Sequence, residues 1–558
     1  MKRFLLLITV ALLNVSMQAQ NTVGLLSYAP LEAYPGYNLH FPHNQGTVYL
    51  LNNCGEIVHS WPDTSGFKPG NGVILRDNGD LVVCKGRGGA SNALIHAGGG
   101  GEKIEIRDWD NNILWSYTLN DSTQRFHHDI ADLPNGNILA IAWDRRTDTE
   151  AIAEGRDTAL LRDGHIWPEK ILELQPIGTG SATVVWQWNA WDHLVQDYDS
   201  TKNNYGVVAD HPELINFNYA TSGDNPDWMH SNSIDYNADY DQILLSVPTF
   251  NEIWIIDHST TTAQAAGSTG GFSGKGGDLM YRFGNPAAYD QGDSTDMVLF
   301  YSHDCHWADK GISAGQPDYN KIMVFNNRAG ADFSTVHSLN PVFDTYDWEY
   351  PIDTATGTWP QAFDWSYQRP VPQDMYSTGL SSVQRLPNGN TLIDVGRFGY
   401  AFEINANEDI VWEYKNPMLG GNPVSQGDTL SINNNIMFRF NRYDTAYTAF
   451  AGRDLSAKGY IELNPDTGFC NLILSVDDII ESNNIQLYPN PATDLINVFF
   501  NDVIKGETII EVLNIYGEIV YSSTINNERE IQINSEKFSS GVYFIRVNET
   551  AVKKFVKL

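Results

Sequence analysis

Short runs of alternating apolar and polar residues recur along most of the chain, and turns rich in Asn, Asp and Gly separate them. One such turn reads Leu-Pro-Asn-Gly-Asn, and it occurs at Asn135 and again at Asn388. This pattern predicts two half-buried strands joined as a hairpin. Six related hairpins have a polar residue seven positions before the turn; these leading residues are Asn71, His128, His230, His303, Ser381 and Asn434.

A second kind of hairpin alternates with the first, and it ends in Trp or Tyr, as in Val48–Trp61 and Phe402–Trp412. Two hairpins per repeat give four short strands, which is typical of a β-propeller blade. The pattern therefore predicts an all-β chain with a six-bladed β-propeller. The leading residues are 53 (Ser381 to Asn434) to 102 (His128 to His230) positions apart. A minimal blade needs only ~40–50 residues, so the surplus is expected in long loops.

The pattern changes after Cys470. Residues 475–484 are polar and predict a linker, whereas residues 485–558 alternate as expected for a small β-sandwich. This tail has Tyr-Pro-Asn-Pro-Ala-Thr-Asp near its start and Ser-Gly-Val-Tyr-Phe-Ile-Arg-Val near its end. It resembles the C-terminal sorting domain of the type IX secretion system of Bacteroidetes. The resemblance implies that the secretion machinery is a partner and that the protein crosses the outer membrane, to be released or attached at the cell surface.

The other end of the chain predicts export as well. Residues 1–19 have a basic start, a short apolar run and small residues at the end, which predicts a signal peptide. Residues 20–474 are then the propeller. No apolar run is long enough for a transmembrane segment. We therefore expect a secreted or surface-attached protein that passes through the periplasm.

Charge and cysteine content narrow the partners and the compartment. The formal net charge of −33 argues against nucleic acid, because phosphate contacts need clustered Lys and Arg. The chain has four cysteines, in a compartment that permits disulfides. Cys54 and Cys84 fall on consecutive predicted strands and are candidates for a disulfide, although buried free thiols fit equally well.

The leading residues are the candidate chemistry, because the start of an inner propeller strand faces the central channel. Three of them are histidines, which act as bases, nucleophiles or metal ligands when neutral and stabilise anions when protonated. Arg328 and Arg397 each follow an inner strand, so each is placed to bind a sulfate or carboxylate. The predicted catalytic residues are His128, His230, His303 and Arg328, and the predicted substrate-binding residues are Asn71, His306, Ser381, Arg397 and Asn434.

A second resemblance covers roughly residues 45–465. Trp228-Met-His-Ser-Asn-Ser-Ile, Phe325-Asn-Asn-Arg and Val383-Gln-Arg-Leu-Pro-Asn-Gly-Asn-Thr-Leu-Ile look like segments of the arylsulfate sulfotransferase family. That family is a six-bladed propeller that moves a sulfuryl group between phenols through a transiently sulfated histidine. The resemblance implies an aryl sulfate or phenol as partner, no cofactor, and site positions at His230, His303 and Arg328.

The sequence departs from this family at the sulfated histidine. That histidine aligns with residues 376–382, which read Tyr-Ser-Thr-Gly-Leu-Ser-Ser, and no histidine follows His337. Either another histidine of the ring serves as nucleophile, or the family's activity is lost. Two alternatives to a sulfotransferase therefore stay open: a non-catalytic surface propeller that binds a glycan or sulfated ligand, and a metal-dependent propeller enzyme.

Overall fold

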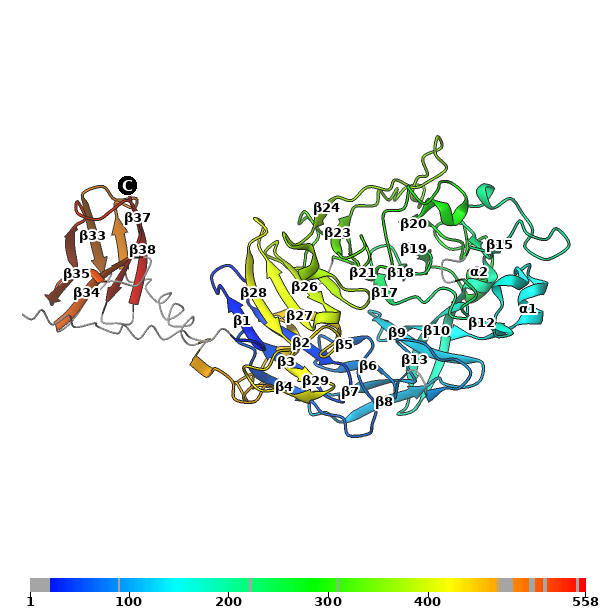
Figure 1. Cartoon of the computed structure of the whole chain (residues 1–558), viewed down its shortest axis with the longest axis horizontal. Helices are drawn as coiled ribbons and strands as arrows, with labels where there is room; N and C mark the ends of the chain where they lie inside the picture. Colours follow the sequence, from blue (N-terminus) through cyan, green and yellow to red (C-terminus); the bar gives the residue numbers. More distant parts are fainter. Residues whose placement is uncertain are drawn as a thin grey trace, which may run out of the picture.

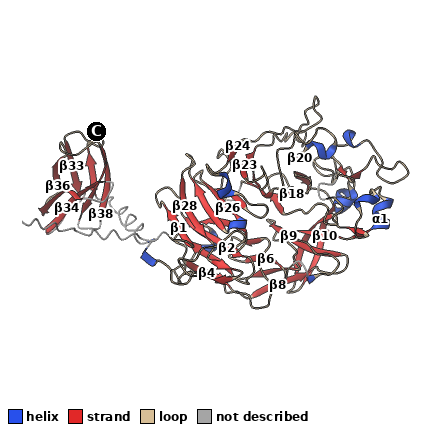
Figure 2. Cartoon of the chain, viewed as in Figure 1, coloured by secondary structure: helices blue, strands red, loops and turns tan. Residues whose placement is uncertain are grey.

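The computed structural model describes residues 21–88, 91–219, 223–308, 311–468, 470, 485–500, 507–514, 519–547 and 551–558. The predicted signal peptide and the predicted linker lie outside these residues. Strands dominate the described chain, and its α-helices are the short α1 (Asp148–Ala153) and α2 (Thr262–Ala265) (Figure 2). The prediction of an all-β protein is confirmed.

Six antiparallel sheets of four or five strands lie in the described part of residues 21–468. In hydrogen-bonded order, the first sheet consists of β31 (Met437–Asp444), β2 (Gly36–Pro42), β3 (Val48–Asn52) and β4 (Ile57–Trp61). The second consists of β5 (Val73–Leu75), β6 (Leu81–Lys85), β7 (Lys103–Arg107) and β8 (Ile113–Thr118). The third consists of β9 (Gln124–Asp132), β10 (Ile138–Asp144), β13 (Glu169–Ile177) and β14 (Ser181–Asn189). The other three are β17 (Ser233–Asn237), β18 (Gln242–Val247), β19 (Glu252–Asp257) and β20 (Tyr281–Phe283); β21 (His303–Trp307), β22 (Ile322–Asn326), β23 (Thr335–Leu339) and β24 (Trp365–Tyr367); and β25 (Ser382–Arg385), β26 (Thr391–Val395), β27 (Tyr400–Ile404), β28 (Ile410–Lys415) and β1 (Gly24–Tyr28). The long connections hold the short pairs β11 (Arg146–Thr147) and β12 (His165–Ile166), β15 (Leu194–Val195) and β16 (Ile215–Asn216), and β29 (Met418–Leu419) and β30 (Asn422–Pro423).

The Asn-Gly turns form the hairpins that the sequence predicts. In the turn between β9 and β10, the Gly136 amide donates to the Leu133 carbonyl at 2.9 Å. Gly136 has a φ of 84° and Gly389, in the matching turn between β25 and β26, has a φ of 88°. Glycine suits this left-handed region because it lacks a Cβ atom. The same turn chemistry therefore starts two sheets that are far apart in the sequence.

Strands from the two ends of this region pair with strands from elsewhere in the chain. The late strand β31 joins the early strand β2, with Leu39 opposite Asn441. The early strand β1 pairs with β28, with Leu25 opposite Tyr414. In Figure 1 the sheets follow one another around this region in chain order, from blue through cyan and green to yellow.

The apolar core lies between neighbouring sheets. One cluster joins Val82 and Ile104 of one sheet to Ile138 and Leu174 of the next. Burying each such side chain contributes about 1.5–3 kcal/mol, so packing between sheets is the main apolar contribution to the free energy of folding.

Buried carboxylates also join β9, β17, β21, β25 and β31, which belong to different sheets and are called the inner strands below. Asp129 Oδ2 accepts the Ile234 amide at 3.1 Å, Asp235 Oδ2 accepts the Trp307 amide at 2.8 Å, and Asp304 Oδ2 accepts the Val383 amide at 2.9 Å. The Arg439 guanidinium of β31 then binds Asp129 through two hydrogen bonds of 3.1 and 2.8 Å and pairs with Asp304 at 2.5 Å. These links fix the inner strands to one another. A closed ring of six blades stays a prediction.

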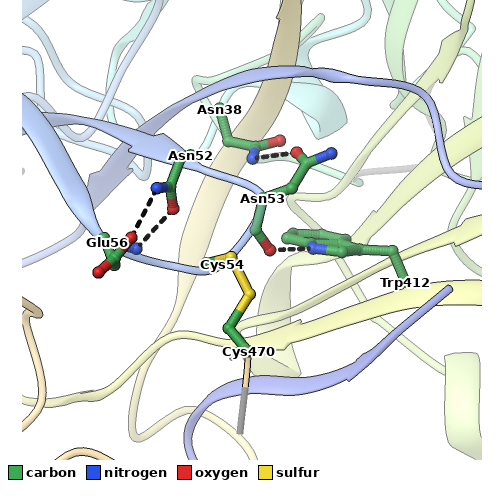
Figure 3. The surroundings of a disulfide bond; sticks show 7 residues. All are labelled: Asn38, Asn52, Asn53, Cys54, Glu56, Trp412 and Cys470. Carbon is green, nitrogen blue, oxygen red and sulfur yellow. Dashed lines mark hydrogen bonds between the residues drawn. A yellow bond between two sulfur atoms is a disulfide. The ribbon is translucent and has the colours of Figure 1, made fainter. Parts of the chain in front are cut away.

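A disulfide joins Cys54 to Cys470, with the two Cα atoms 5.6 Å apart (Figure 3). That separation is ordinary for a disulfide. The candidate pairing of Cys54 with Cys84 is wrong: Cys84 is a buried thiol in β6, inside the core of the next sheet. Beside the disulfide, the Asn53 carbonyl accepts the Trp412 indole N–H at 2.8 Å, so the turn that holds Cys54 is also tied to β28.

The C-terminal residues form two further sheets. One consists of β32 (Ile485–Tyr488), β33 (Leu495–Phe500) and β36 (Glu530–Asn534), and the other of β35 (Ile519–Asn526), β34 (Glu507–Asn514), β37 (Gly541–Val547) and β38 (Ala551–Lys557). Side chains from both sheets, among them Val498, Val512 and Ile545, share one buried core. This is the layering expected of a small sandwich.

Candidate functional site

An open pocket of about 600 Å³ lies beside the inner strands. Its lining includes two predicted catalytic residues, His230 and Arg328. The other polar and aromatic lining residues include His96, Asp227, Asn251 and Tyr301. They come from the loops that connect the strands. A pocket of this size accepts a small organic ligand.

Tyr301 and Arg328 form one wall of this pocket. The Arg328 guanidinium lies 3.8 Å from the centroid of the Tyr301 ring, which is a close cation–π contact. Arg328 Nε donates to the Thr378 carbonyl at 3.1 Å, and the Tyr301 amide donates to Asn251 Oδ1 at 2.8 Å. Tyr301 has a φ of 56°, which is rare for an aromatic residue. These contacts hold it in a strained conformation, of the kind found at functional sites.

His230 is held as a proton donor. Its Nδ1 lies 2.5 Å from Asp227 Oδ2, and Asp227 Oδ1 accepts the Trp143 indole N–H at 2.9 Å. Burial by itself lowers the pKa of His230, but the Asp227 carboxylate outweighs burial and raises that pKa above its ordinary value. The Asp227 carboxylate therefore favours the charged imidazolium, whose second nitrogen carries a transferable proton.

His303 has the opposite protonation. Its Nδ1 lies 2.8 Å from Asn327 Oδ1, while Asn327 Nδ2 donates to the carbonyls of Ser377 and Leu380 at 2.9 and 2.8 Å. The amide oxygen of Asn327 can only accept, so His303 carries its proton on Nδ1 and leaves a lone pair on Nε2. Burial lowers the pKa of His303 to about 3, so the ring stays neutral.

His128 lies next to His230, with the ring centroids 4.6 Å apart. Its Nδ1 is 2.9 Å from His127 Nδ1, and His127 Nε2 is 2.7 Å from Glu169 Oε2. Burial holds the pKa of His128 well below its ordinary range and lowers that of His127 to about 3. The Nε2 edge of His128 faces Gly99, where an added Cβ atom would lie 2.0 Å from that nitrogen. The ring is thus neutral and covered by the loop that holds Gly99.

Arg397 adds a second cation near Arg328. An ideal Cβ atom at Gly379 would lie 3.6 Å from both Arg397 Nη2 and His303 Cε1, so these two side chains meet beside Gly379. Burial lowers the pKa of Arg397, although Tyr301 opposes this shift. The guanidinium keeps its charge, because Arg is not deprotonated in proteins. Two guanidinium groups near the partly exposed phenol of Tyr301 favour an anion with several oxygens, such as a sulfate ester.

The structure places the other four predicted site residues in local hydrogen bonds. His306 Nδ1 lies 3.1 Å from the Asp304 carbonyl, and Ser381 Oγ accepts the Gly396 amide at 2.9 Å. Asn71 Nδ2 lies 3.7 Å from Cys84 Sγ, and Asn434 Oδ1 accepts the Ser431 amide at 2.9 Å. These residues do not line the pocket that holds His230 and Arg328.

Several residues around the pocket were not predicted from the sequence. Asp227, Tyr301 and Asn327 each lie within three positions of His230, His303 or Arg328, which is the signal that could have identified them. His127 is buried beside His128, where the pairing of β9 with β10 shifts register between Ala140 and Ala142.

The described residues contain no group of three or more His, Cys, Asp and Glu side chains that could hold a metal ion. The histidines instead bind carboxylates, an amide and one another. The alternative of a metal-dependent enzyme therefore has no supporting ligand set in the described chain.

Comparison with known proteins gives two family matches. Residues 32–423 match the family model described as arylsulfotransferase (ASST), and residues 486–558 match the one described as secretion system C-terminal sorting domain. No curated protein matches the chain. The sorting domain indicates export and a secreted or cell-surface location. Among the described residues, no helix is long and apolar enough to span a membrane.

Solved structures give weaker likenesses. A protein of unknown function from Bacteroides caccae is 12% identical with a TM-score of 0.38, and the match covers 73% of this chain and 99% of that one. A periplasmic gluconolactonase from Pseudomonas aeruginosa is 9% identical with a TM-score of 0.34, over 73% and 98% of the two chains. Virginiamycin B lyase from Staphylococcus aureus is 11% identical with a TM-score of 0.31, over 71% and 88%. Scores this low carry no argument about function.

The first family match covers more than half of the chain, including all the pocket residues named above. The chain therefore belongs to the arylsulfotransferase family and ends in a secretion system C-terminal sorting domain.

Proposed function

We propose that this protein transfers a sulfuryl group from an aryl sulfate to a phenol, without a nucleotide donor, at the pocket that His230 and Arg328 line, with His303 and Arg397 nearby. The observation that carries the proposal is the pairing of opposite protonation states beside two cations. His230 is held protonated by Asp227, whereas His303 is held neutral with a free lone pair. Group transfer between phenols needs one acid and one base or nucleophile, and this pocket offers both.

Each residue has a chemical role in this proposal. Arg328 and Arg397 bind the oxygens of the sulfuryl group and stabilise the charge that shifts among them in the transition state. His230 gives its Nε2 proton to the departing phenolate. His303 Nε2 supplies a lone pair, for attack on sulfur or for accepting a proton. Tyr301 presents an aromatic face beside Arg328, against which an aryl ring can pack.

We further propose that the six sheets of residues 21–468 are the blades of a six-bladed β-propeller. The pairing of β31 with β2 supports this proposal, because it places a late strand in the first sheet. The carboxylate links between β9, β17, β21 and β25 support it as well, because they follow chain order. Full closure removes the exposed sheet edges that would otherwise pair with other chains.

The substitution at residues 376–382 supports a second candidate function. No histidine side chain extends from this segment, although Arg328 lines the pocket and Arg397 lies near it. A protein that binds an aryl sulfate or a sulfated glycan without turning it over would also need these cations. In this alternative, His230 contributes only its positive charge.

An assay with p-nitrophenyl sulfate as donor and phenol as acceptor separates the two functions. We expect the wild-type protein to release p-nitrophenol and form phenyl sulfate. The Arg328→Met variant should lose roughly 10²–10³-fold in rate, the usual cost of removing one group that stabilises transition-state charge. The exposed Arg162, whose side chain is 59% accessible, provides the matched control Arg162→Met, which should leave the rate unchanged. Binding of p-nitrophenyl sulfate with no release of p-nitrophenol would favour the non-catalytic protein.

A further inference from the structure

Tyr301 presents a phenol on the lining of the pocket. The residue is partly exposed, and among the described residues its hydroxyl has no hydrogen-bond partner, while its backbone amide and the face of its ring are both held. A phenol that is fixed in place, yet unpartnered beside a ligand pocket, is available for a ligand or a reaction.

The surroundings of Tyr301 are those of a reacting group. Its ring centroid lies 6.1 Å from that of His230 and 5.9 Å from that of His303, so the phenol stands between the protonated and the neutral histidine. The Arg328 guanidinium covers one face at 3.8 Å. The backbone φ of 56° shows that the local structure enforces this position against a steric cost.

The other candidate nucleophiles are placed less well. The Nε2 edge of His128 is covered by Gly99. His230 is bound to Asp227 and favours the protonated form, which has no lone pair to attack with. Ser381 Oγ accepts a backbone amide and lies outside the pocket lining. Tyr301, by contrast, lines the pocket and is itself a phenol, the class of acceptor in the proposed reaction.

We propose that Tyr301 is the covalent carrier of the sulfuryl group, so that the resting protein is sulfated on its own phenol by the aryl sulfate donor. This inference rests on the proposed sulfuryl transfer and replaces the family's sulfated histidine with a tyrosine. In the first step, the Tyr301 oxygen forms a bond to sulfur and the bond between sulfur and the donor oxygen breaks. The Tyr301 proton passes through His303 Nε2 to water, which leaves His303 neutral, and the departing phenolate takes the proton of His230 Nε2.

The second step reverses these roles. The acceptor phenol attacks the sulfur of sulfated Tyr301 and gives its proton to His230, which is now neutral. The Tyr301 oxygen leaves and recovers a proton from water. Atoms and charges balance over the two steps, and the reaction needs no further reactant. A shared carrier of this kind predicts ping-pong kinetics.

The test incubates the full-length protein with p-nitrophenyl sulfate in the absence of an acceptor, followed by peptide mass spectrometry. We expect one sulfuryl group, which fragmentation of the peptide places on Tyr301 and not on His303, and its loss when phenol is added. The exposed Tyr346, 92% accessible, is the internal control, and its peptide should stay unmodified. A sulfuryl group placed by fragmentation on a histidine, or equal modification of Tyr301 and Tyr346, would overturn the proposal.

Variants provide an independent readout. Tyr301→Phe keeps the ring under Arg328 and removes only the hydroxyl, so transfer should fall at least about a thousandfold, as for loss of a covalent nucleophile. Tyr346→Phe should transfer at the wild-type rate. If Tyr301→Phe stays within about tenfold of wild type, Tyr301 is only a packing surface and the carrier proposal is wrong. The two proposals fail differently: without p-nitrophenol release and phenyl sulfate formation by the wild type, sulfuryl transfer itself is refuted.

Discussion

Arg439 is the residue whose loss should most weaken the contacts between inner strands. Its side chain is 12% exposed, and it binds Asp129 and Asp304, which are 0% and 5% exposed. The change Arg439→Met removes the charge and keeps much of the apolar volume. It leaves two buried carboxylates without their cation, and removing one partner of a buried pair costs about 3–5 kcal/mol.

The expected change in melting temperature follows from this loss of stability and from the size of the domain. The unfolding entropy near the midpoint is ~2.1 cal/mol/K per residue, so a domain of about 450 residues has about 0.9 kcal/mol/K. A loss of about 3–5 kcal/mol therefore lowers Tm by about 3–5 °C. Differential scanning calorimetry measures this shift.

A matched variant and a second substitution test the cause. Arg162 pairs with Asp224 at 3.4 Å, but its side chain is 59% exposed, so Arg162→Met should cost about 0–1 kcal/mol. Adding Asp129→Asn to Arg439→Met should recover part of the lost stability, because it removes one uncompensated charge. Equal melting temperatures for Arg439→Met and Arg162→Met would refute the argument that the buried pair locks the inner strands.

Three further predictions concern protonation and covalent structure. If His230 is the acid, activity falls as pH rises through the raised pKa of His230. The Asp227→Asn variant removes the carboxylate that raises this pKa, so the falling limb of the pH–rate profile should move to lower pH. An unchanged limb would exclude His230 as the acid. Two carboxylates bind His258, and they outweigh burial and raise the pKa of His258 to about 9. The stability that these ion pairs give the folded protein is therefore complete below the unfolded pKa of about 6.5 and is lost as pH rises through about 9. The stability gap between wild type and His258→Gln in urea titrations should therefore narrow between these two values, and a gap independent of pH would contradict the ion pairs. The Cys470→Ser variant lacks the disulfide and should lose about 2–4 kcal/mol of unfolding free energy. Reduction of the wild type should cause the same loss. An unchanged Tm under both treatments would argue against the bond.

The strand pattern could be predicted because it depends on neighbours in the sequence. Alternation sets which side chains can be buried, and a glycine such as Gly136 or Gly389 permits a turn that other residues resist. The repeated spacing of such turns therefore predicted an all-β chain and the hairpins that begin its sheets. The tail motifs likewise identified the sorting domain, because they are local and specific.

The disulfide partner of Cys54 depended on the tertiary structure. Cys54 and Cys470 are 416 positions apart, so strand order brings them together where no local pattern does. The same holds for Arg439, whose partners Asp129 and Asp304 come from two other sheets.

The candidate site likewise has features that the sequence indicates and features that only the tertiary structure shows. Residues such as His230, His303 and Arg328 could be named as candidates from the sequence, because their register or a family motif marks them. Their protonation was not, because it depends on Asp227 and Asn327 as fixed partners and on burial among several sheets. Tyr301 belongs to the second group: the sequence shows only that it lies near His303, and the packing of Arg328 and two histidines around its ring is seen only in the tertiary structure. Sequence determines which strands form, because strand formation is local; the tertiary structure decides which side chains meet and in which charge state, because both depend on distant neighbours and on exclusion of water.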